Sequence, residues 1–167
     1  MRAELWVIRH GAATERAPDG ADDAQRPLTP KGERQARRVR QVLPRIDRLF
    51  ASPRLRAAQT AAPLADRAPA GLETLAALAD AEAVELPAAL ASALRAGALP
   101  DARPVRVAVV GHEPQLSEAI GLMIGDGERP ATVRMRKGSV ARLSGTLRPG
   151  GMALELLLSQ SDLKRLG

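Results

Sequence analysis

The chain of 167 residues contains no cysteine, so disulfide bonds and thiol chemistry are both excluded. The lack of cysteine also favours a reducing compartment. No apolar run approaches the roughly 20 residues that a membrane helix needs. The first apolar run of the chain, residues 5–8, is too short for the apolar region of a signal peptide. We therefore expect a cytoplasmic protein with no membrane partner.

Aromatic residues are nearly absent, since Trp6 and Phe50 are the only two. The apolar core must then be built from leucine, valine, isoleucine and alanine. The net charge is +6 and comes mostly from arginine. Such a charge can attract nucleic acid, anionic membranes or phosphorylated substrates, but single-stranded nucleic acid is usually bound on aromatic stacking platforms. We expect no nucleic acid partner and attribute most arginines to an Ala-, Arg-, Gly- and Pro-rich composition.

Short apolar runs alternate with helical patterns through most of the chain. Runs without polar alternation predict strands that are covered on both faces, as in a parallel sheet, and Thr29-Pro30 is a helix start signal. The segment 72–78 fits a strand end or a helix start. The predicted strands are 5–9, 48–52 and 105–110, and the other predicted helices are 55–68, 87–98 and 115–124.

The C-terminal part has a different pattern, with strands predicted over 132–147 and 152–158 around Pro149-Gly150-Gly151. The whole order predicts an α/β fold in a single domain over residues 1–167. We expect a three-layer α/β/α arrangement with a central, mostly parallel sheet and antiparallel C-terminal edge strands.

The only two histidines, His10 and His112, each follow a predicted strand directly. A third predicted strand ends at Ser52 and leads to Arg56. Ligands of open α/β sheets gather at the carboxyl ends of the strands, so His10, Arg9, Arg56 and His112 are expected in one place. A histidine at a strand end is more often structural, and only the neighbouring arginines and motifs favour chemistry here.

Two imidazoles and two guanidiniums suit the handling of phosphoryl groups. Guanidiniums bind phosphate oxygens bidentately and stay charged, and a neutral imidazole can attack phosphorus to form a phosphohistidine. Two histidines without cysteine and without an HExxH spacing do not provide the ligands of a zinc site. No GxSxG motif supports a serine hydrolase. We expect no metal and no cofactor.

Four segments in order resemble the histidine phosphatase superfamily, also known as the phosphoglycerate-mutase-like family. Arg9-His10-Gly11 is similar to its first motif and Val109-Val110-Gly111-His112 to its last. Between them lie a segment similar to the family's LTxxGxxQA motif and another similar to its SPxxRAxQT motif. In the first of these, Thr29, Gly32 and Gln35 are expected to form the start of a helix. The sequences are Leu28-Thr29-Pro30-Lys31-Gly32-Glu33-Arg34-Gln35-Ala36 and Ser52-Pro53-Arg54-Leu55-Arg56-Ala57-Ala58-Gln59-Thr60.

The small size and the Leu55-Arg56-Ala57 form of the arginine motif resemble the SixA branch, the phosphohistidine phosphatases. This resemblance implies that His10 is the nucleophile and that Arg9, Arg56 and His112 form the phosphate pocket. It also implies a phosphorylated histidine on a partner protein as substrate, reached through an open, shallow site. We expect the protein to act as a monomer.

Larger members of the family supply an acidic general acid before the second histidine, and this chain has alanine where that glutamate is expected. Asp80, Glu82 or Glu85 could substitute. A missing acid is tolerable for a phosphohistidine, whose imidazole is a better leaving group than an alkoxide. Two alternatives stay open: a phosphatase of a small phosphate ester, and a non-catalytic module that binds phosphate or nucleic acid.

Side chains near the motifs have structural interpretations. Ser52 is expected to cap the helix that follows Pro53. A hydrogen bond from Glu113 to His112 is the structural alternative to a catalytic role for that histidine. Asp22 and Asp23 are interpreted as solvated loop charges.

Three arginines alternate along the predicted strand 132–147, namely Arg134, Arg136 and Arg142. The alternation favours a solvent-facing side of the sheet. A docking surface for an acidic partner is the alternative interpretation.

Overall fold

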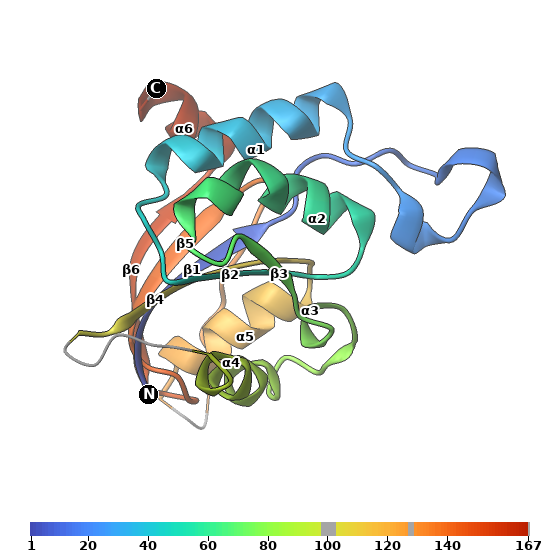
Figure 1. Ribbon diagram of the computed structural model, residues 1–167. Helices are drawn as coiled ribbons and strands as arrows, with labels where there is room; N and C mark the ends of the chain where they lie inside the picture. Colours follow the sequence, from blue (N-terminus) through green and yellow to red (C-terminus); the bar gives the residue numbers. More distant parts are fainter. Residues whose placement is uncertain (98–102, 127–128, 167) are drawn as a thin grey trace.

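The computed structural model describes residues 1–97, 103–126 and 129–166. One six-stranded sheet runs through its centre in the order β3-β2-β4-β1-β5-β6 (Figure 1). The strands are β1 (Arg2–Arg9), β2 (Arg48–Ala51), β3 (Leu72–Thr74), β4 (Val105–Gly111), β5 (Val140–Thr146) and β6 (Met152–Leu158). Strands β3, β2, β4 and β1 are parallel, whereas β5 is antiparallel to both β1 and β6. The predicted mostly parallel sheet with an antiparallel C-terminal pair is confirmed.

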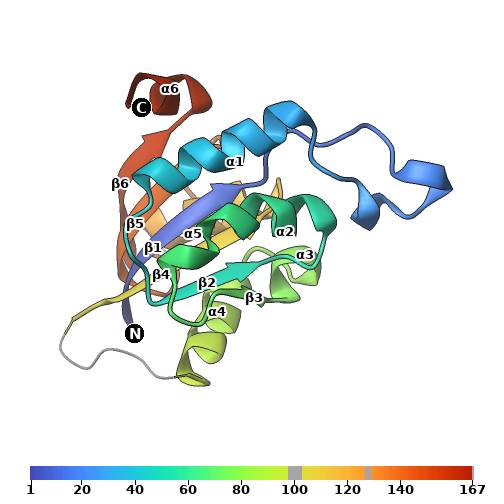
Figure 2. The ribbon, with the colours of Figure 1, turned by 45° about the horizontal axis from the view of Figure 1, so that its top comes forward.

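Helices cover both faces of the sheet, which confirms the three-layer prediction. One face carries α1 (Pro30–Val42), α2 (Leu55–Ala61) and α6 (Gln160–Leu166), and the other carries α3 (Ala77–Asp80), α4 (Leu86–Arg95) and α5 (Gln115–Ile124) (Figures 1 and 2). The described ranges also contain three 3-10 turns: η1 (Pro18–Gly20), η2 (Asp23–Gln25) and η3 (Ala62–Arg67). Among the described residues, no helix has the length and apolarity needed to cross a membrane.

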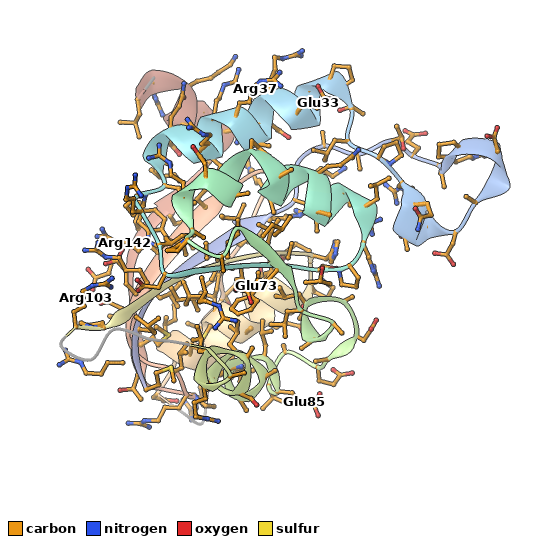
Figure 3. All side chains as sticks on the ribbon, viewed as in Figure 1. Glu33, Arg37, Glu73, Glu85, Arg103 and Arg142 are labelled. Atoms are coloured by element: carbon orange, nitrogen blue, oxygen red, sulfur yellow. The ribbon has the colours of Figure 1, made fainter. Side chains whose placement is uncertain are left out.

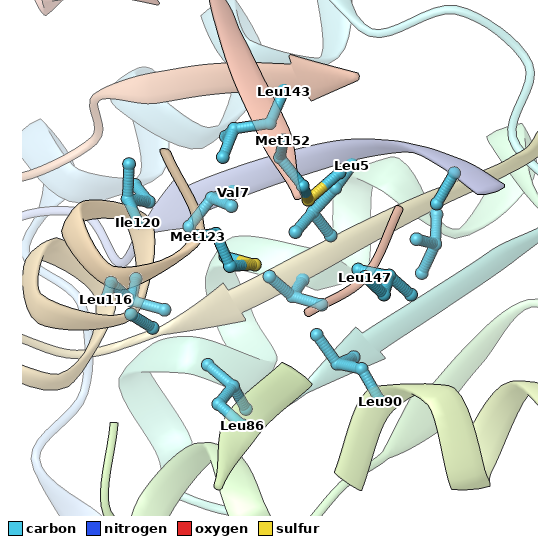
Figure 4. Close-up of a cluster of buried hydrophobic side chains, with 14 of the residues drawn as sticks. Leu5, Val7, Leu86, Leu90, Leu116, Ile120, Met123, Leu143, Leu147 and Met152 are labelled. Atoms are coloured by element: carbon cyan, nitrogen blue, oxygen red, sulfur yellow. The ribbon is translucent and has the colours of Figure 1, made fainter. Parts of the chain in front are cut away.

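The central strands are apolar on both faces because each face has its own core. Trp6 and Ile8 of β1 pack under α1 and α2, while Leu5 and Val7 point to the opposite core (Figure 4). This alternation explains why β1 is a continuous apolar run rather than a polar–apolar pattern. The buried side chains that surround Leu5 and Val7 include Leu86, Leu90, Leu116, Ile120, Met123, Leu143, Leu147 and Met152.

Some predicted helix ends were wrong, and the structure resolves a segment that the sequence left open. The helix over 55–68 ends at Ala61 and continues as η3, where Pro63 cannot donate a backbone hydrogen bond. The ambiguous segment 72–78 contains both β3 and the start of α3. Helix α4 ends at Arg95, and residue 98, the predicted end, lies outside the described residues.

The predicted strand 132–147 forms only from Val140. Upstream, the backbone of Met135 bonds to side chains instead of a strand: its N–H donates to Ser117 Oγ (3.3 Å) and its carbonyl accepts from Arg9. Gly138, at φ +72, then turns the chain into β5. Arg134 and Arg136 are therefore exposed loop residues beside the end of β1, and only Arg142 lies on a strand.

Helix α6 was not predicted, although a local signal exists. Ser159 Oγ accepts from Asp162 N (3.4 Å), and Asp162 Oδ2 accepts from Ser159 N (2.9 Å). This reciprocal pair is a capping box with aspartate in the position of glutamate. Leu163 then buries its side chain against the core beneath α1.

Candidate active site

The carboxyl ends of three adjacent parallel strands bring the two histidines together. His10 follows β1, His112 follows β4, and Ser52 follows β2. Backbone bonds fix this junction, from His10 N to Gly111 O (3.1 Å) and from Ser52 N to Val110 O (3.0 Å). The two imidazole rings lie 5.1 Å apart between centroids and are tilted by 51°.

The ring of His10 is held in one tautomer. Its Nδ1 lies 2.7 Å from Gly11 O. Because a carbonyl oxygen only accepts, Nδ1 carries the proton and Nε2 keeps its lone pair. Burial lowers the pKa of His10 to about 4, and the positive charges of Arg56 and Arg9 add to this effect. The imidazole is therefore neutral at pH 7, with Nε2 free to act as a nucleophile.

The turn after His10 is fixed by the second and third motifs. Gly11 N donates to Thr60 Oγ1 (3.0 Å), and Ala12 N donates to Gln35 Oε1 (2.8 Å). Gln35 thus holds the histidine turn and is more than the helix-start residue predicted from the sequence.

Glycine is needed where this turn meets the start of α1. A Cβ on Gly11 would lie 2.8 Å from Gly32 O, and a Cβ on Gly32 would collide with Ala12 O. Thr29 caps α1 as predicted, since its Oγ1 accepts from Gly32 N (3.2 Å), and its own N–H donates to Ala12 O (2.8 Å). The spacing of the second motif therefore serves the position of His10.

Arg56 is buried and is held by the loop between β1 and α1. Its Nη1 donates to Asp23 O (2.8 Å) and its Nη2 to Asp23 Oδ2 (3.0 Å). The other edge of the guanidinium, with Nε–H and a second Nη2 hydrogen, remains for an anion.

The interpretation of Asp22 and Asp23 as merely solvated was wrong, because both carboxylates have structural partners. Asp23 also accepts from Arg26 Nη1 (2.7 Å), and Asp22 Oδ1 accepts from Ala24 N (2.7 Å) to cap η2. The hydrogen bond from Arg26 and the charge of Arg56 lower the pKa of Asp23. The spacing of three residues between Asp23 and Arg26 was the sequence signal that could have indicated a structural ion pair.

Arg9, the residue before His10, has one bonded and one unpaired donor. Its Nη1 donates to Met135 O (2.7 Å), whereas its Nε is buried and has no hydrogen-bond partner among the described residues. An unpaired buried donor is costly, and an anion beside His10 would satisfy it.

His112 bonds to Ser52 and not to Glu113. The roles inferred for Ser52 and Glu113 from the sequence therefore need correction. His112 Nε2 lies 2.8 Å from Ser52 Oγ. Ser52 Oγ does accept from Arg54 N (3.3 Å) near the start of α2, but its contact with His112 was missed. Glu113 instead accepts a hydrogen bond from Ser117, and burial raises the pKa of its carboxyl.

The second nitrogen of His112, Nδ1, is buried and has no partner in the described part of the chain. Burial lowers the pKa of His112 to about 3, and the nearby His10 and Arg56 contribute to the shift. An anion in the site would reverse the electrostatic part of this shift, because negative charge favours imidazolium.

None of the candidate acids is bonded to the two histidines in the described part of the chain. Asp80 is exposed at the end of α3, and Glu82 lines a separate cavity of about 500 Å³ beside α5. Glu85 Oε2 accepts from Glu82 N (3.1 Å) and so has a structural role. No recorded hydrogen bond or ion pair among the described residues joins any of the three to His10 or His112. Likewise, no group of three or more potential metal ligands is found in the described ranges.

A three-layer α/β fold with two histidines and two arginines at the strand ends defines a class of phosphate-handling enzymes. A sequence model of the histidine phosphatase superfamily, branch 1, matches residues 5–136, and the chain belongs to this superfamily. It is a phosphatase by this membership. An uncharacterized protein of Picosynechococcus is 42% identical over 119 residues, which is 69% of each chain.

Solved structures share the fold over almost the whole chain. A structure assigned to the phosphohistidine phosphatase SixA of Nakamurella multipartitia is 26% identical, with a TM-score of 0.70 and coverage of 95% of this chain and 96% of that one. The protein histidine phosphatase SixA complexed with tungstate has a TM-score of 0.73 at 24% identity, covering 98% and 99%. A phosphoserine phosphatase of Entamoeba histolytica in complex with 3-phosphoglyceric acid has a TM-score of 0.68 at 16% identity, covering 96% and 99%.

Proposed function

We propose that this phosphatase forms a covalent phosphohistidine on His10, needs no metal, and removes phosphate from a phosphohistidine on another protein. The observation that carries the proposal is the fixed tautomer of His10. Its Nδ1–H donates to Gly11 O, so the lone pair of Nε2 stands ready beside a group of cationic donors. Phosphoryl transfer depends mainly on such positioning and charge stabilisation.

In the first step, Nε2 of His10 attacks phosphorus in line and a new N–P bond forms. The P–N bond of the substrate breaks, and its electron pair returns to the departing imidazole. A substrate protonated on its distal nitrogen departs as neutral imidazole. In the second step, water attacks the phosphorus of phospho-His10. The oxygen and both protons of water leave with phosphate, and the electron pair of the N–P bond returns to Nε2.

Arg9, Arg56 and His112 would stabilise the transferring oxygens. Arg9 Nε and His112 Nδ1 are buried atoms without partners in the described ranges, and a phosphoryl group would satisfy both. If the Ser52 hydroxyl donates to Nε2 of a neutral His112, the ring proton is on Nδ1. Nδ1–H would then donate to a phosphoryl oxygen.

The exposure of the candidate acids, with no bond to the histidines among the described residues, supports a phosphohistidine over an ester as substrate. An alkoxide leaving group needs a proton at the bond that breaks, whereas a protonated phosphohistidine departs as neutral imidazole without that help. Asp80 and Glu82 are exposed, and no recorded bond ties either to the histidines. The likeness to SixA structures supports the same choice of substrate.

The test mixes the protein with a histidine-phosphotransfer domain carrying ³²P-phosphohistidine. We expect release of phosphate and a transient labelled protein, stable to base and labile to acid, with neither product formed by His10→Ala. Equal dephosphorylation by both proteins would contradict the proposal. The absence of any labelled intermediate in rapid-quench samples would contradict the covalent step.

A small phosphate ester is the second candidate substrate, favoured by the fold shared with the phosphoserine phosphatase. It predicts strong turnover of metabolite esters and loss of that turnover in Asp80→Asn or Glu82→Gln. A panel of esters that gives no activity above background would remove it.

A further inference from the structure

A groove between α1 and α6 is lined almost entirely by cations and polar groups. Its volume is about 350 Å³, and its lining residues are Lys31, Arg34, Gln35, Arg38, Gln160, Ser161 and Lys164. The two helices lie side by side on one face of the sheet (Figures 1 and 2). All four ionisable side chains in this lining are positively charged, and none is a carboxylate.

These four cations differ from other arginines of the same surface, which are paired. Arg37 pairs with Glu33 (4.0 Å), which Figure 3 labels beside it on α1, and Arg165 pairs with Asp162 (2.7 Å). These pairs occupy the acidic side chains of α1 and α6. In the described part of the chain, no ion pair is recorded for Lys31, Arg34, Arg38 or Lys164. The groove is therefore an uncompensated positive surface.

The groove adjoins the candidate active site through shared residues. Gln160 Nε2 donates to Gly138 O (2.7 Å), and Gly138 N donates to His10 O (3.0 Å). Gln35, on the opposite wall, holds the turn after His10 through Ala12. Because β5 begins and β6 ends at the edge where β1 ends, the start of α6 lies at the active-site edge of the sheet.

Exposed cations continue from the groove to the histidines. Arg136 and Lys137 lie in the turn that ends at Ser139, whose N–H donates to Arg136 O (2.8 Å). Lys137 is close enough for its charge to lower the pKa of His10. A large anionic partner that reaches His10 can thus contact the groove and this turn at the same time.

We propose that the groove between α1 and α6 docks an acidic segment of the phosphorylated protein substrate while its phosphohistidine enters the site at His10. The proposal rests on the proposed function and adds the surface that selects the partner. Charge complementarity at such a rim raises association rates and excludes partners of the wrong charge. Single-stranded nucleic acid is disfavoured as occupant because Trp6 and Phe50, the one tryptophan and the one phenylalanine of a chain without tyrosine, are both buried in the core.

The test compares Arg34→Glu/Lys164→Glu with Arg37→Glu/Arg165→Glu, a control on the same two helices with the same change in charge. Each is assayed against a phosphorylated histidine-phosphotransfer domain with acidic residues around its phosphohistidine, and against free phosphohistidine. We expect the groove variant to lose about tenfold in kcat/KM on the domain at low salt, through KM, and less as salt rises. Turnover of free phosphohistidine should be unchanged. The control should match wild type on both substrates.

Equal losses on both substrates would overturn the proposal in favour of a structural role for the groove. No loss on the domain, or the same loss in the control, would also overturn it. A groove variant that loses binding to a fluorescent oligonucleotide or to vesicles with phosphatidylserine, yet keeps its rate on the domain, would assign the groove to another occupant. If wild type hydrolyses free phosphohistidine but no phosphorylated domain, the protein substrate itself is wrong. If it hydrolyses neither, the proposed function fails.

Discussion

The two buried histidines should make this protein lose stability in mild acid. Burial holds the pKa of His10 at about 4 and that of His112 at about 3, whereas both titrate near 6.5 in the unfolded chain. Below pH 6.5 the unfolded chain therefore binds protons that the folded chain does not. The free energy of unfolding falls as pH drops, until the folded-state pKa values are reached.

The size of the effect follows from the pKa difference. Each pH unit in this window is worth about 1.4 kcal/mol per histidine. Between neutral pH and pH 5, each histidine should therefore lower the free energy of unfolding by about 2 kcal/mol. Domains of this size have total stabilities of roughly 5–15 kcal/mol, so the loss is large enough to measure.

The assay is urea unfolding at pH 8, 7, 6 and 5 for wild type and for His10→Gln/His112→Gln. Above pH 5 most carboxyl groups stay ionised in both states. Burial raises the pKa of Glu113, whose protonation on folding would oppose the loss slightly. This contribution is common to both proteins. The histidine effect is thus the difference between the two pH dependences. Parallel curves for wild type and variant from pH 8 to 5 would refute the reasoning.

Three further changes test individual contacts. Ser52→Ala leaves His112 Nε2 buried without its partner and should lower kcat by about ten- to a hundredfold, the equivalent of roughly 1–3 kcal/mol; an unchanged kcat on phosphohistidine would exclude a positioning role. Gly32→Ala forces a Cβ against Ala12 O and should cost about 1–3 kcal/mol in urea unfolding; wild-type stability would mean that the turn yields freely. Leu163→Ala removes the buried anchor of α6 and should cost roughly 2–5 kcal/mol; a thermal melt identical to wild type would show that α6 contributes no stability.

Much of the fold could be predicted because its signals are local. The apolar runs of β1 and β4 and the Thr29 cap are properties of neighbouring residues, and α5 was predicted with its observed bounds. The missed features depend on contacts distant in sequence. Residues 132–136 have a strand-like composition, but Arg9 and Ser117 bond the backbone at Met135 and keep it out of the sheet. Helix α6 is seven residues long, so its apolar pattern is too short to recognise.

The candidate site shows the same division. The order of the motifs is enough to place His10, His112 and Arg56 at neighbouring strand ends, because parallel strands deliver their carboxyl ends to one edge. Sequence alone did not reveal that Asp23 holds Arg56, or that Ser52 contacts His112. Both pairs join residues more than 30 positions apart. Those contacts exist only after the sheet has formed.

The sequence by itself determined the class of the protein and identified the candidate residues of its site, because both depend on short motifs. Tertiary structure decided the tautomer of His10, the low pKa values of both histidines and the uncompensated groove between α1 and α6. Each of these depends on burial or on charges brought together from distant segments. Local sequence patterns do not specify burial or the distances between charges of distant segments, because only the folded chain sets them.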